Sequence, residues 1–363
     1  MIFVTSLRRQ AITGIALALL VFTALPSAAE ESAPPQAERR FTAMTYNLYL
    51  GADLGPVFVA PPGPPLVAAA AQVHGQMVQT NFPERAEVIA REIVEESPAV
   101  IGLQEVALWE TAPLSNPSQF QTTYDFRAIL LDELEERGAD YEAVATNVNF
   151  SGALPISATT LARLTMRDVI LARSDLSTSE LKVSHPTSHN FQAKLPLAIG
   201  GNPIQVLRGW SSVDVKVRGK SYRFVNTHLE AFSAVIRNLQ AQELAAWMSE
   251  SPLPVVLVGD LNSLPTDLAG AYGIMLSAGF VDTWVEAMDG LPGFTAGQDA
   301  DLMNLPSELD HTVDYVMHNE DGFVDAVPGS GDIIGEEVAD RTPSGLWPSD
   351  HAGMSITLHI AQP

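Results

Sequence analysis

The sequence predicts a mixed α/β or α+β domain in which at least some strands pair antiparallel. After residue 40, short runs rich in Val, Ile, Tyr and Thr recur, and several are followed by stretches of helical periodicity. Two of these runs are separated only by Arg218-Gly219-Lys220, which suits the turn of a β-hairpin. The chain has 363 residues, 46% hydrophobic and 17% charged, so it can bury a sizeable core and is neither disordered nor collagen-like.

The strands are predicted from apolar runs in which β-branched and aromatic residues are frequent. In chain order they are Phe41–Leu50, Ala99–Val106, Tyr141–Val148, Val169–Ala172, Val213–Val217, Tyr222–His228, Val255–Val258, Thr312–Met317 and Met354–Ile360.

The helices are predicted from apolar residues that recur at helical spacing. In Glu84–Glu96, Pro83 occupies the opening position, and Ile89, Ile93 and Val94 form one apolar face. The other predicted helices are Tyr124–Arg137, Ala234–Ser249 and Thr266–Ala278.

Two long stretches carry neither pattern. Gly51–Phe82 contains five prolines, and Asn149–Arg167 shows no regular period. Long irregular segments inside a domain are uncommon and tend to be functional, so we expect both to form the rim of a site. The alternative is that they are flexible surface insertions.

The N-terminus has the pattern of a secretory signal. Arg8 and Arg9 precede an apolar run from Ala11 to Leu25, and small residues follow up to Ala29. We therefore expect cleavage near Ala29 and a secreted or periplasmic protein. The alternative, a retained membrane anchor, is disfavoured because the run is short for a spanning helix. Residues 30–40 are polar and contain prolines, which predicts a flexible lead-in to a domain over residues 41–363.

Charge and cysteine content exclude several classes of site. Removing residues 1–29 takes away two arginines and no acid, so the formal net charge falls from −23 to −25. Such a chain has little bulk attraction for polyanions and no polybasic membrane anchor. No later run is long enough to span a membrane, so we expect no stable membrane insertion after cleavage, and nothing calls for an obligate protein partner. The absence of cysteine excludes disulfides, thiolate nucleophiles and Cys-based zinc sites.

Polar side chains gather at the ends of the predicted strands, where ligands collect in α/β proteins. Carboxylates and amide oxygens of this kind suit Mg²⁺ or Mn²⁺, and also Ca²⁺. Histidines beside such a site can exchange protons near neutral pH. No zinc-type His-Glu-x-x-His and no phosphate-binding Gly-x-x-x-x-Gly-Lys-Ser/Thr occurs. Metal-assisted hydrolysis of a phosphoester is the chemistry that fits. The residues concerned are Asn47, Glu105, His228, Asp260, Asn262, Asp350 and His351.

Six short motifs in a fixed order resemble the endonuclease/exonuclease/phosphatase superfamily, which includes DNase I-like nucleases, sphingomyelinases and inositol phosphatases. The resemblance covers roughly residues 41–360. It implies a four-layered α/β sandwich of two packed β-sheets flanked by helices. The motifs are Thr45-Tyr46-Asn47, Leu103-Gln104-Glu105, Thr227-His228-Leu229, Gly259-Asp260-Leu261-Asn262-Ser263, Val313-Asp314-Tyr315-Val316 and Ser349-Asp350-His351.

The resemblance also implies roles for these residues. Glu105 matches the main metal ligand, with Asn47 beside it, and Asp350 is assigned to the same metal. Asp260 matches the carboxylate that activates or orients the attacking water, and Asn262 its neighbouring amide. The remaining roles are a phosphate contact for His228, an acid that orients a histidine for Asp314, and phosphate binding with proton exchange for His351.

Arg167 is a further candidate, because nucleases of this superfamily sometimes carry an arginine there that holds a phosphate. The alternative is a strand-start arginine paired with Asp168.

Together these features predict a secreted, divalent-metal-dependent phosphoester hydrolase, first of all a phosphodiesterase of endonuclease type. One alternative is a sphingomyelinase- or phospholipase C-like enzyme or a phosphatase, acting on a lipid or small phosphoester. The other is a catalytically silent binding module on the same fold.

Overall fold

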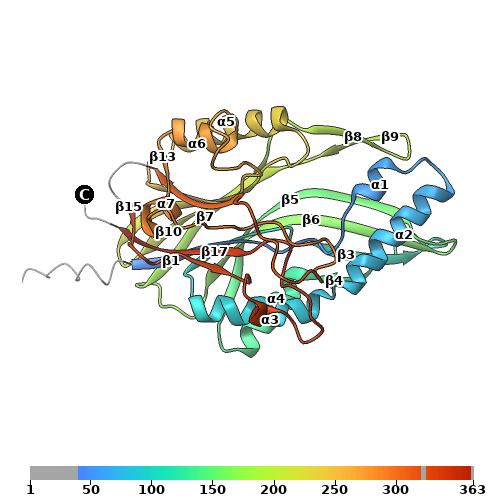
Figure 1. The fold of residues 1–363 in the computed structure, drawn as a ribbon, viewed down its shortest axis with the longest axis horizontal. Coiled ribbons are helices and arrows are strands. Elements are labelled where there is room, and N and C mark those ends of the chain that lie inside the picture. Colours follow the sequence, from blue (N-terminus) through green and yellow to red (C-terminus); the bar gives the residue numbers. More distant parts are fainter. Residues whose placement is uncertain (1–39, 320–323, 361–363) are drawn as a thin grey trace, which may run out of the picture. The chain divides into compact units, whose positions relative to one another are not determined.

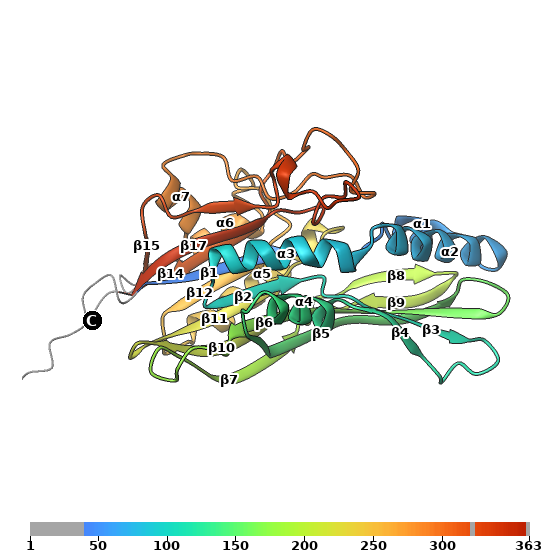
Figure 2. The same ribbon diagram turned by 90° about the horizontal axis from the view of Figure 1, so that it is seen from below.

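Two β-sheets pack face to face in the computed structural model, and helices cover their outer faces (Figures 1 and 2). The structure describes residues 40–319 and 324–360. The predicted signal peptide and all but the last residue of the predicted lead-in lie outside the described residues, so those boundaries stay predictions.

The larger sheet contains both ends of the described chain. Its central strands β1 and β2 run parallel, and their neighbours β17 and β6 run antiparallel to them. The strand order is β15 (Val324–Ala326), β17 (Gly353–Ile360), β1 (Arg40–Asn47), β2 (Val100–Gln104), β6 (Thr160–Arg173), β3 (Leu108–Pro113) and β4 (Gln121–Asp125), with β16 (Asp332–Ile334) on β17 and β5 (Tyr141–Pro155) on β6.

The smaller sheet is built around a second parallel pair, β11 and β12. The predicted hairpin turn joins β10 to β11, and Arg218 and Gly219 both have positive φ, as a two-residue hairpin turn requires. The strand order is β13 (Phe280–Asp282), β14 (Asp314–Asn319), β12 (Val255–Asp260), β11 (Lys220–His228), β10 (Gly209–Val217) and β7 (Leu181–Asn190); a separate ribbon consists of β8 (Leu195–Ile199) and β9 (Asn202–Val206).

The helices lie on the outer faces of the sheets and at one end of the larger one (Figure 2). α3 begins with a proline in its first turn, and Asp125 caps the start of α4 because its side chain accepts the backbone N–H groups of Arg127 and Ala128. The helices are α1 (Gly55–Val59), α2 (Pro64–Gln79), α3 (Phe82–Glu96), α4 (Phe126–Glu136), α5 (Ala234–Ser249), α6 (Ala271–Ser277) and α7 (Thr283–Met288), with a 3₁₀ turn at Val338–Asp340.

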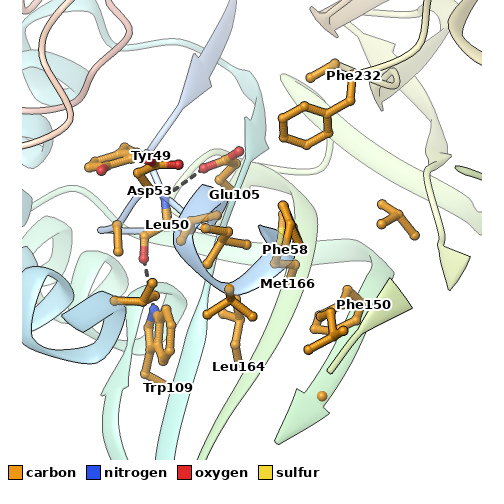
Figure 3. Close-up of a pocket in the computed structure, with 18 of the residues that line it drawn as sticks. Tyr49, Leu50, Asp53, Phe58, Glu105, Trp109, Phe150, Leu164, Met166 and Phe232 are labelled. Carbon is orange, nitrogen blue, oxygen red and sulfur yellow. Dashed lines mark hydrogen bonds between the residues drawn. The ribbon is translucent and has the colours of Figure 1, made fainter. Parts of the chain in front are cut away.

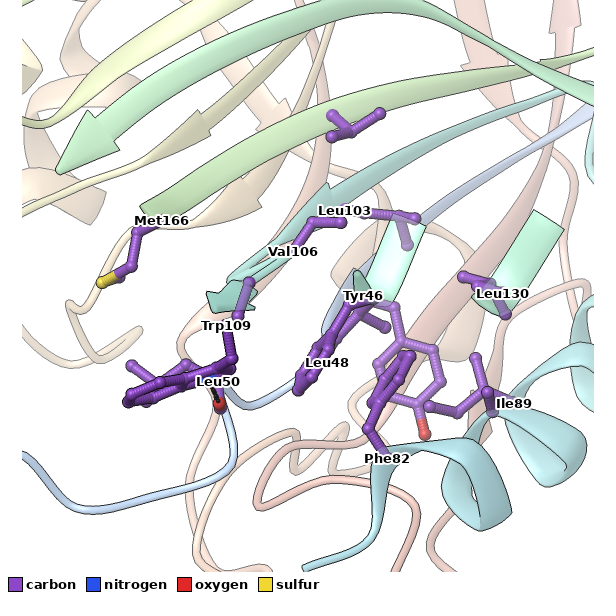
Figure 4. Close-up of a cluster of buried hydrophobic side chains, with 14 of the residues drawn as sticks. Tyr46, Leu48, Leu50, Phe82, Ile89, Leu103, Val106, Trp109, Leu130 and Met166 are labelled. Carbon is purple, nitrogen blue, oxygen red and sulfur yellow. Dashed lines mark hydrogen bonds between the residues drawn. The ribbon is translucent and has the colours of Figure 1, made fainter. Parts of the chain in front are cut away.

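Three buried clusters separate the four layers. One lies between the larger sheet and α2, α3 and α4, where Tyr46, Phe82 and Leu130 pack together (Figure 4). The second lies between the sheets, and the third lies between the smaller sheet and α5 and α6. β12 serves both faces, with Val256 and Val258 in the second cluster and Val255 and Leu257 in the third. The predicted four-layered α/β sandwich is therefore confirmed.

A buried polar link joins the sheets near their centre. Asn226 of β11 accepts a hydrogen bond from Gln104 Nε2 at 2.7 Å and donates to the carbonyls of Leu103 and Val169, both in the larger sheet. Gly102 lies against this link, and a Cβ there would meet Val258 Cγ2 at 2.3 Å. The sheets approach closely here because residue 102 has no side chain.

Each predicted strand and helix overlaps an observed one, whereas both stretches predicted to be irregular are regular. Gly51–Phe82 forms α1 and α2, and 149–167 forms most of the β5–β6 hairpin. Pro64 and Pro65 fall in the first turn of α2, where the missing N–H groups cost nothing. Apolar and polar residues do not alternate regularly along β5. It forms a strand because β6 pairs with it along nearly its whole length.

Candidate active site

The two parallel strand pairs end at one edge of the sandwich and bring four predicted residues there. Asn47 ends β1, and Glu105 follows β2 in the larger sheet. His228 and Asp260 end β11 and β12 in the smaller sheet and are register partners. Asn47 Nδ2 donates to Asp260 Oδ2 at 3.2 Å, so the site is formed across both sheets.

One histidine and two carboxylates form a row across the smaller sheet. Asp260 lies opposite Asp314 in the β12–β14 register, and His228 Nε2 is 3.4 Å from Asp260 Oδ2. Asp260 Oδ1 accepts the backbone N–H of Asn262 at 2.7 Å. Burial, and then the carboxylate of Asp314, raise the pKa of Asp260 to about 7. A carboxyl group tuned to this range can accept a proton from water near neutral pH.

His351, which is half-buried, forms a pair with Asp314. Its Nδ1 is 2.8 Å from Asp314 Oδ2, and Asp314 is fully buried. Thr295 Oγ accepts the backbone N–H of Asp314 at 3.1 Å and so fixes the acid. Burial alone would lower the pKa of His351, but the charges of Asp314 and Asp350 hold it well above its usual value. The imidazole is therefore held as a cation that can donate a proton.

Glu105 and Asp350 form the acidic part of the site. Glu105 Oε2 accepts the backbone N–H of Leu50 at 2.8 Å, and Ser349 Oγ donates to the carbonyl of Asn47 at 2.7 Å. Burial and then the carboxylate of Asp350 raise the pKa of Glu105 to about 7. Glu105 also has a φ of 56°, a left-handed conformation that is uncommon and strained for a residue other than glycine.

These residues fit a divalent metal ion. The carboxylates of Glu105 and Asp350 lie beside the amide of Asn47. Loss of solvation raises the pKa of both, and the charge of Asp350 raises that of Glu105 further, so a cation between them would stabilise their ionised forms. An all-oxygen set of this kind suits Mg²⁺ or Mn²⁺. The residues that would hold the ion are Asn47, Glu105 and Asp350, the set that the sequence analysis assigned to the metal.

A second group of potential ligands lies close by. One atom each of Asp260, Asp314 and His351 lies within 4.8 Å of the others. In this group His351 Nδ1 and Asp314 Oδ2 already share a hydrogen bond, so these two atoms are not free to bind a metal ion. We therefore assign this group to proton transfer and the Glu105 group to the metal.

Arg208 is a site residue that the sequence analysis missed. It precedes β10, lines the site, and its Nη1 lies 2.9 Å from His228 Nδ1. Because arginine can only donate, His228 Nδ1 accepts, and the ring proton is on Nε2. Burial, and then the charge of Arg208, hold the pKa of His228 well below its usual value. His228 is therefore a neutral hydrogen-bond donor, not a proton-exchanging base.

Arg167 does not join the other predicted residues. It is buried, donates to the carbonyls of Val106 and Ala107, and forms an ion pair with Asp125. It does not line the site cavity. Its partner is Asp125 and not Asp168, because Asp168 accepts hydrogen bonds from Asn149 Nδ2 and the backbone N–H of Glu105. Arg167 thus holds the segment after β2, whereas Arg208 is an arginine that lines the site cavity.

Arg85 is a second missed residue, and it lies behind the site. Its guanidinium donates to the carbonyls of Leu48, Tyr49 and Pro348 and is fully buried. These carbonyls flank Asn47 on one side and Asp350 on the other. A single side chain of α3 therefore fixes two segments that are about 300 residues apart.

A model of the endonuclease/exonuclease/phosphatase family matches residues 44–351, which span every residue of the site. The chain belongs to this family. Its members are phosphoester hydrolases and generally depend on divalent metal ions. The resemblance found in the six sequence motifs is therefore confirmed.

Solved structures support the fold independently. An endonuclease/exonuclease/phosphatase family protein from Leptotrichia buccalis is 17% identical with a TM-score of 0.55, covering 88% of this chain and 100% of its own. TDP2 of D. rerio, complexed with a single-strand DNA product, is 16% identical with a TM-score of 0.51, covering 88% and 99%. A mannosyl-6-phosphatase of Bacteroides thetaiotaomicron is also 16% identical, with a TM-score of 0.51, and the match covers 88% of this chain and 99% of its own. Among curated proteins, none matches significantly. At these identities the structures show the fold alone.

Proposed function

We propose that the protein is a secreted, divalent-metal-dependent phosphodiesterase that uses Mg²⁺ or Mn²⁺. The observation that supports this most directly is that one cavity is lined by the acidic residues Glu105 and Asp350 and by His351, whose ring is paired with Asp314. A phosphate between them would meet a metal on one side and a proton donor on the other.

The residues divide the reaction between them. Asp260 accepts a proton from the attacking water, while Asn262 and Asn47 hold Asp260 in place. The water oxygen bonds to phosphorus, the P–O bond to the leaving alcohol breaks, and His351 supplies the proton to that oxygen. When bound, the metal neutralises charge on the phosphoryl oxygens. Arg208 and His228 line the same cavity, and we assign them to hydrogen bonds with those oxygens.

The substrate class is the finer part of the proposal. A nuclease-type substrate was predicted first, and one structural neighbour holds a single-strand DNA product while another is a sugar phosphatase. Within the described residues, Arg208 is the only arginine or lysine that lines the cavity, and Arg167 points elsewhere. A substrate with one phosphate fits this better than a polyanion, so the geometry favours the lipid or small phosphodiester predicted as the alternative.

Hydrolysis of bis(4-nitrophenyl) phosphate with and without metal tests the reaction class. We expect activity with Mg²⁺ or Mn²⁺ and its loss with EDTA. Glu105→Gln should raise the metal concentration for half-maximal rate by at least about tenfold, because one charged ligand is removed. Glu250→Gln, an exposed acid at the end of α5, is the matched control and should change nothing. Full activity of metal-free protein, or of Glu105→Gln at low metal, would contradict the assignment.

Secretion is tested separately, by the N-terminal sequence of the protein recovered from the periplasm or medium. We expect it to begin near Glu30. An intact Met1 in the exported protein would contradict the predicted cleavage. Among the helices of residues 40–319 and 324–360, none combines the length and apolarity needed to cross a membrane.

A further inference from the structure

The candidate active site is the polar end of a cavity of about 580 Å³. The cavity continues between α1, α2, the β5–β6 hairpin and the β8–β9 ribbon. Figure 3 shows Glu105 and Tyr49 on one side of this hollow, and Trp109, Leu164 and Phe150 on the other. The volume is that of a typical small-molecule site. Both stretches predicted as rim insertions, Gly51–Phe82 and 149–167, supply its walls.

Away from the polar end, hydrocarbon side chains dominate the lining. Aliphatic and aromatic residues come from four separate elements and face one space. Water in such a space finds few hydrogen-bond partners, so an apolar group would displace it at a gain. This apolar surface offers nothing to the phosphate group of a substrate, so it must contact another part of the molecule. The side chains concerned include Val57, Phe58, Val73, Leu164, Met166 and Ile204.

The charged side chains that line the cavity suit a substrate with a single phosphate group, bound at the polar end. The anionic oxygens of a substrate can meet Arg208 and His351 at the polar end. Beyond it, the described lining residues include the carboxylate of Asp53 and no lysine or arginine apart from Arg208. A second phosphate in the cavity would therefore be repelled and unpaired, whereas a hydrocarbon chain would be in contact with carbon on several sides.

The mouth of the cavity is also apolar. Phe58 in the wall packs edge-on against Phe232, with ring centroids 5.8 Å apart, and Phe232 is 69% exposed. Val59, which follows Phe58, and Val235, three residues after Phe232, are 82% and 71% exposed. Clustered exposed apolar residues beside a binding site indicate contact with an apolar ligand or surface.

We infer that the substrate is an amphiphilic phosphodiester whose phosphate lies between Glu105 and His351 and whose hydrocarbon chain fills the cavity past Phe58. This inference rests on the proposed phosphodiesterase activity and adds its substrate class. The exposed rim at Phe232 would receive the chain from water, from a micelle or from a lipid surface.

A series of alkyl 4-nitrophenyl phosphates, from methyl to dodecyl, tests the inference with metal present and below the critical micelle concentration. Burial of a methylene group favours binding, so kcat/KM should rise about fourfold with each added methylene. The rise should stop once the cavity is filled. The same esters presented in vesicles show whether the rim takes substrate from a lipid surface.

Variants separate the chain-binding wall from the reaction. Phe58→Asp should remove most of the chain-length dependence of kcat/KM, because a carboxylate would replace an apolar ring in the wall of the cavity. Phe232→Asp should reduce turnover from vesicles more than turnover of monomeric esters. Val285→Asp is the matched control, since Val285 is 59% exposed on α7 and lies outside the cavity. It should behave as wild type in every arm.

The outcomes distinguish the two proposals. No metal-dependent turnover of any ester would refute the proposed function itself. Turnover of the methyl ester with no increase for longer chains would overturn the amphiphile inference and leave the function standing. A higher kcat/KM for DNA than for the best alkyl ester, or an unchanged chain-length slope in Phe58→Asp, would overturn it as well.

Discussion

Asp314→Asn is the sharpest test of how the site handles protons. The substitution keeps the shape of a fully buried side chain and removes its charge, 2.8 Å from His351 Nδ1. Removing one partner of a buried ion pair lowers the free energy of unfolding by about 3–5 kcal/mol, because the other charge is left uncompensated. If the pair is needed in the transition state, kcat should fall about 10²- to 10⁴-fold.

The chain provides a matched control for this change. Asp310 also contacts a histidine, with its Oδ1 at 2.6 Å from His311 Nδ1, but its side chain is 80% exposed. Asp310→Asn should change kcat less than twofold, since water solvates both groups. The assay is steady-state hydrolysis of methyl 4-nitrophenyl phosphate at saturating Mg²⁺, with circular dichroism to verify folding. A folded Asp314→Asn within threefold of wild type would refute the proposed role of the pair.

Three further predictions concern stability and the metal. Burial, and then the charge of Asp340, raise the pKa of Glu92 well above its ordinary value of 4.5. The folded state therefore keeps a proton that the unfolded chain releases, so this contribution to stability is full below 4.5 and is lost as pH rises through the folded pKa. Glu92→Gln should consequently match wild type in mild acid and melt higher at neutral and alkaline pH, and equal melting curves at pH 8 would contradict this. Asn226→Ala should lower the free energy of unfolding by about 2–4 kcal/mol in urea titrations, since buried Gln104 loses a partner, whereas Asn238→Ala, which loses one bond near the surface, should cost less than about 1 kcal/mol. Added Mg²⁺ or Mn²⁺ should raise the melting temperature of wild type and not of Glu105→Gln, which calorimetry can measure without any substrate.

The sequence by itself determined the regular core and most of the site. Strands buried on both faces, such as β12, appear as continuous apolar runs, and amphipathic helices such as α3 repeat their apolar residues at helical spacing. Polar residues that follow such strands were predicted to meet at one edge. Asn47, Glu105, His228 and Asp260 do so, because the parallel pairs β1–β2 and β11–β12 end on the same side.

Only the tertiary structure decided which side chains are partners and what surrounds the site. Arg167 and Arg208 are both arginines near strand ends, but the first pairs with Asp125 and the second with His228. Which partner each arginine finds depends on which segments, distant in sequence, become neighbours in the fold. The apolar cavity arises in the same way, since α1 and α2, the β5–β6 hairpin and the β8–β9 ribbon each contribute one wall. Hydrophobic periodicity is a local property of the chain, whereas a cavity and an ion pair are set by contacts between segments remote in sequence.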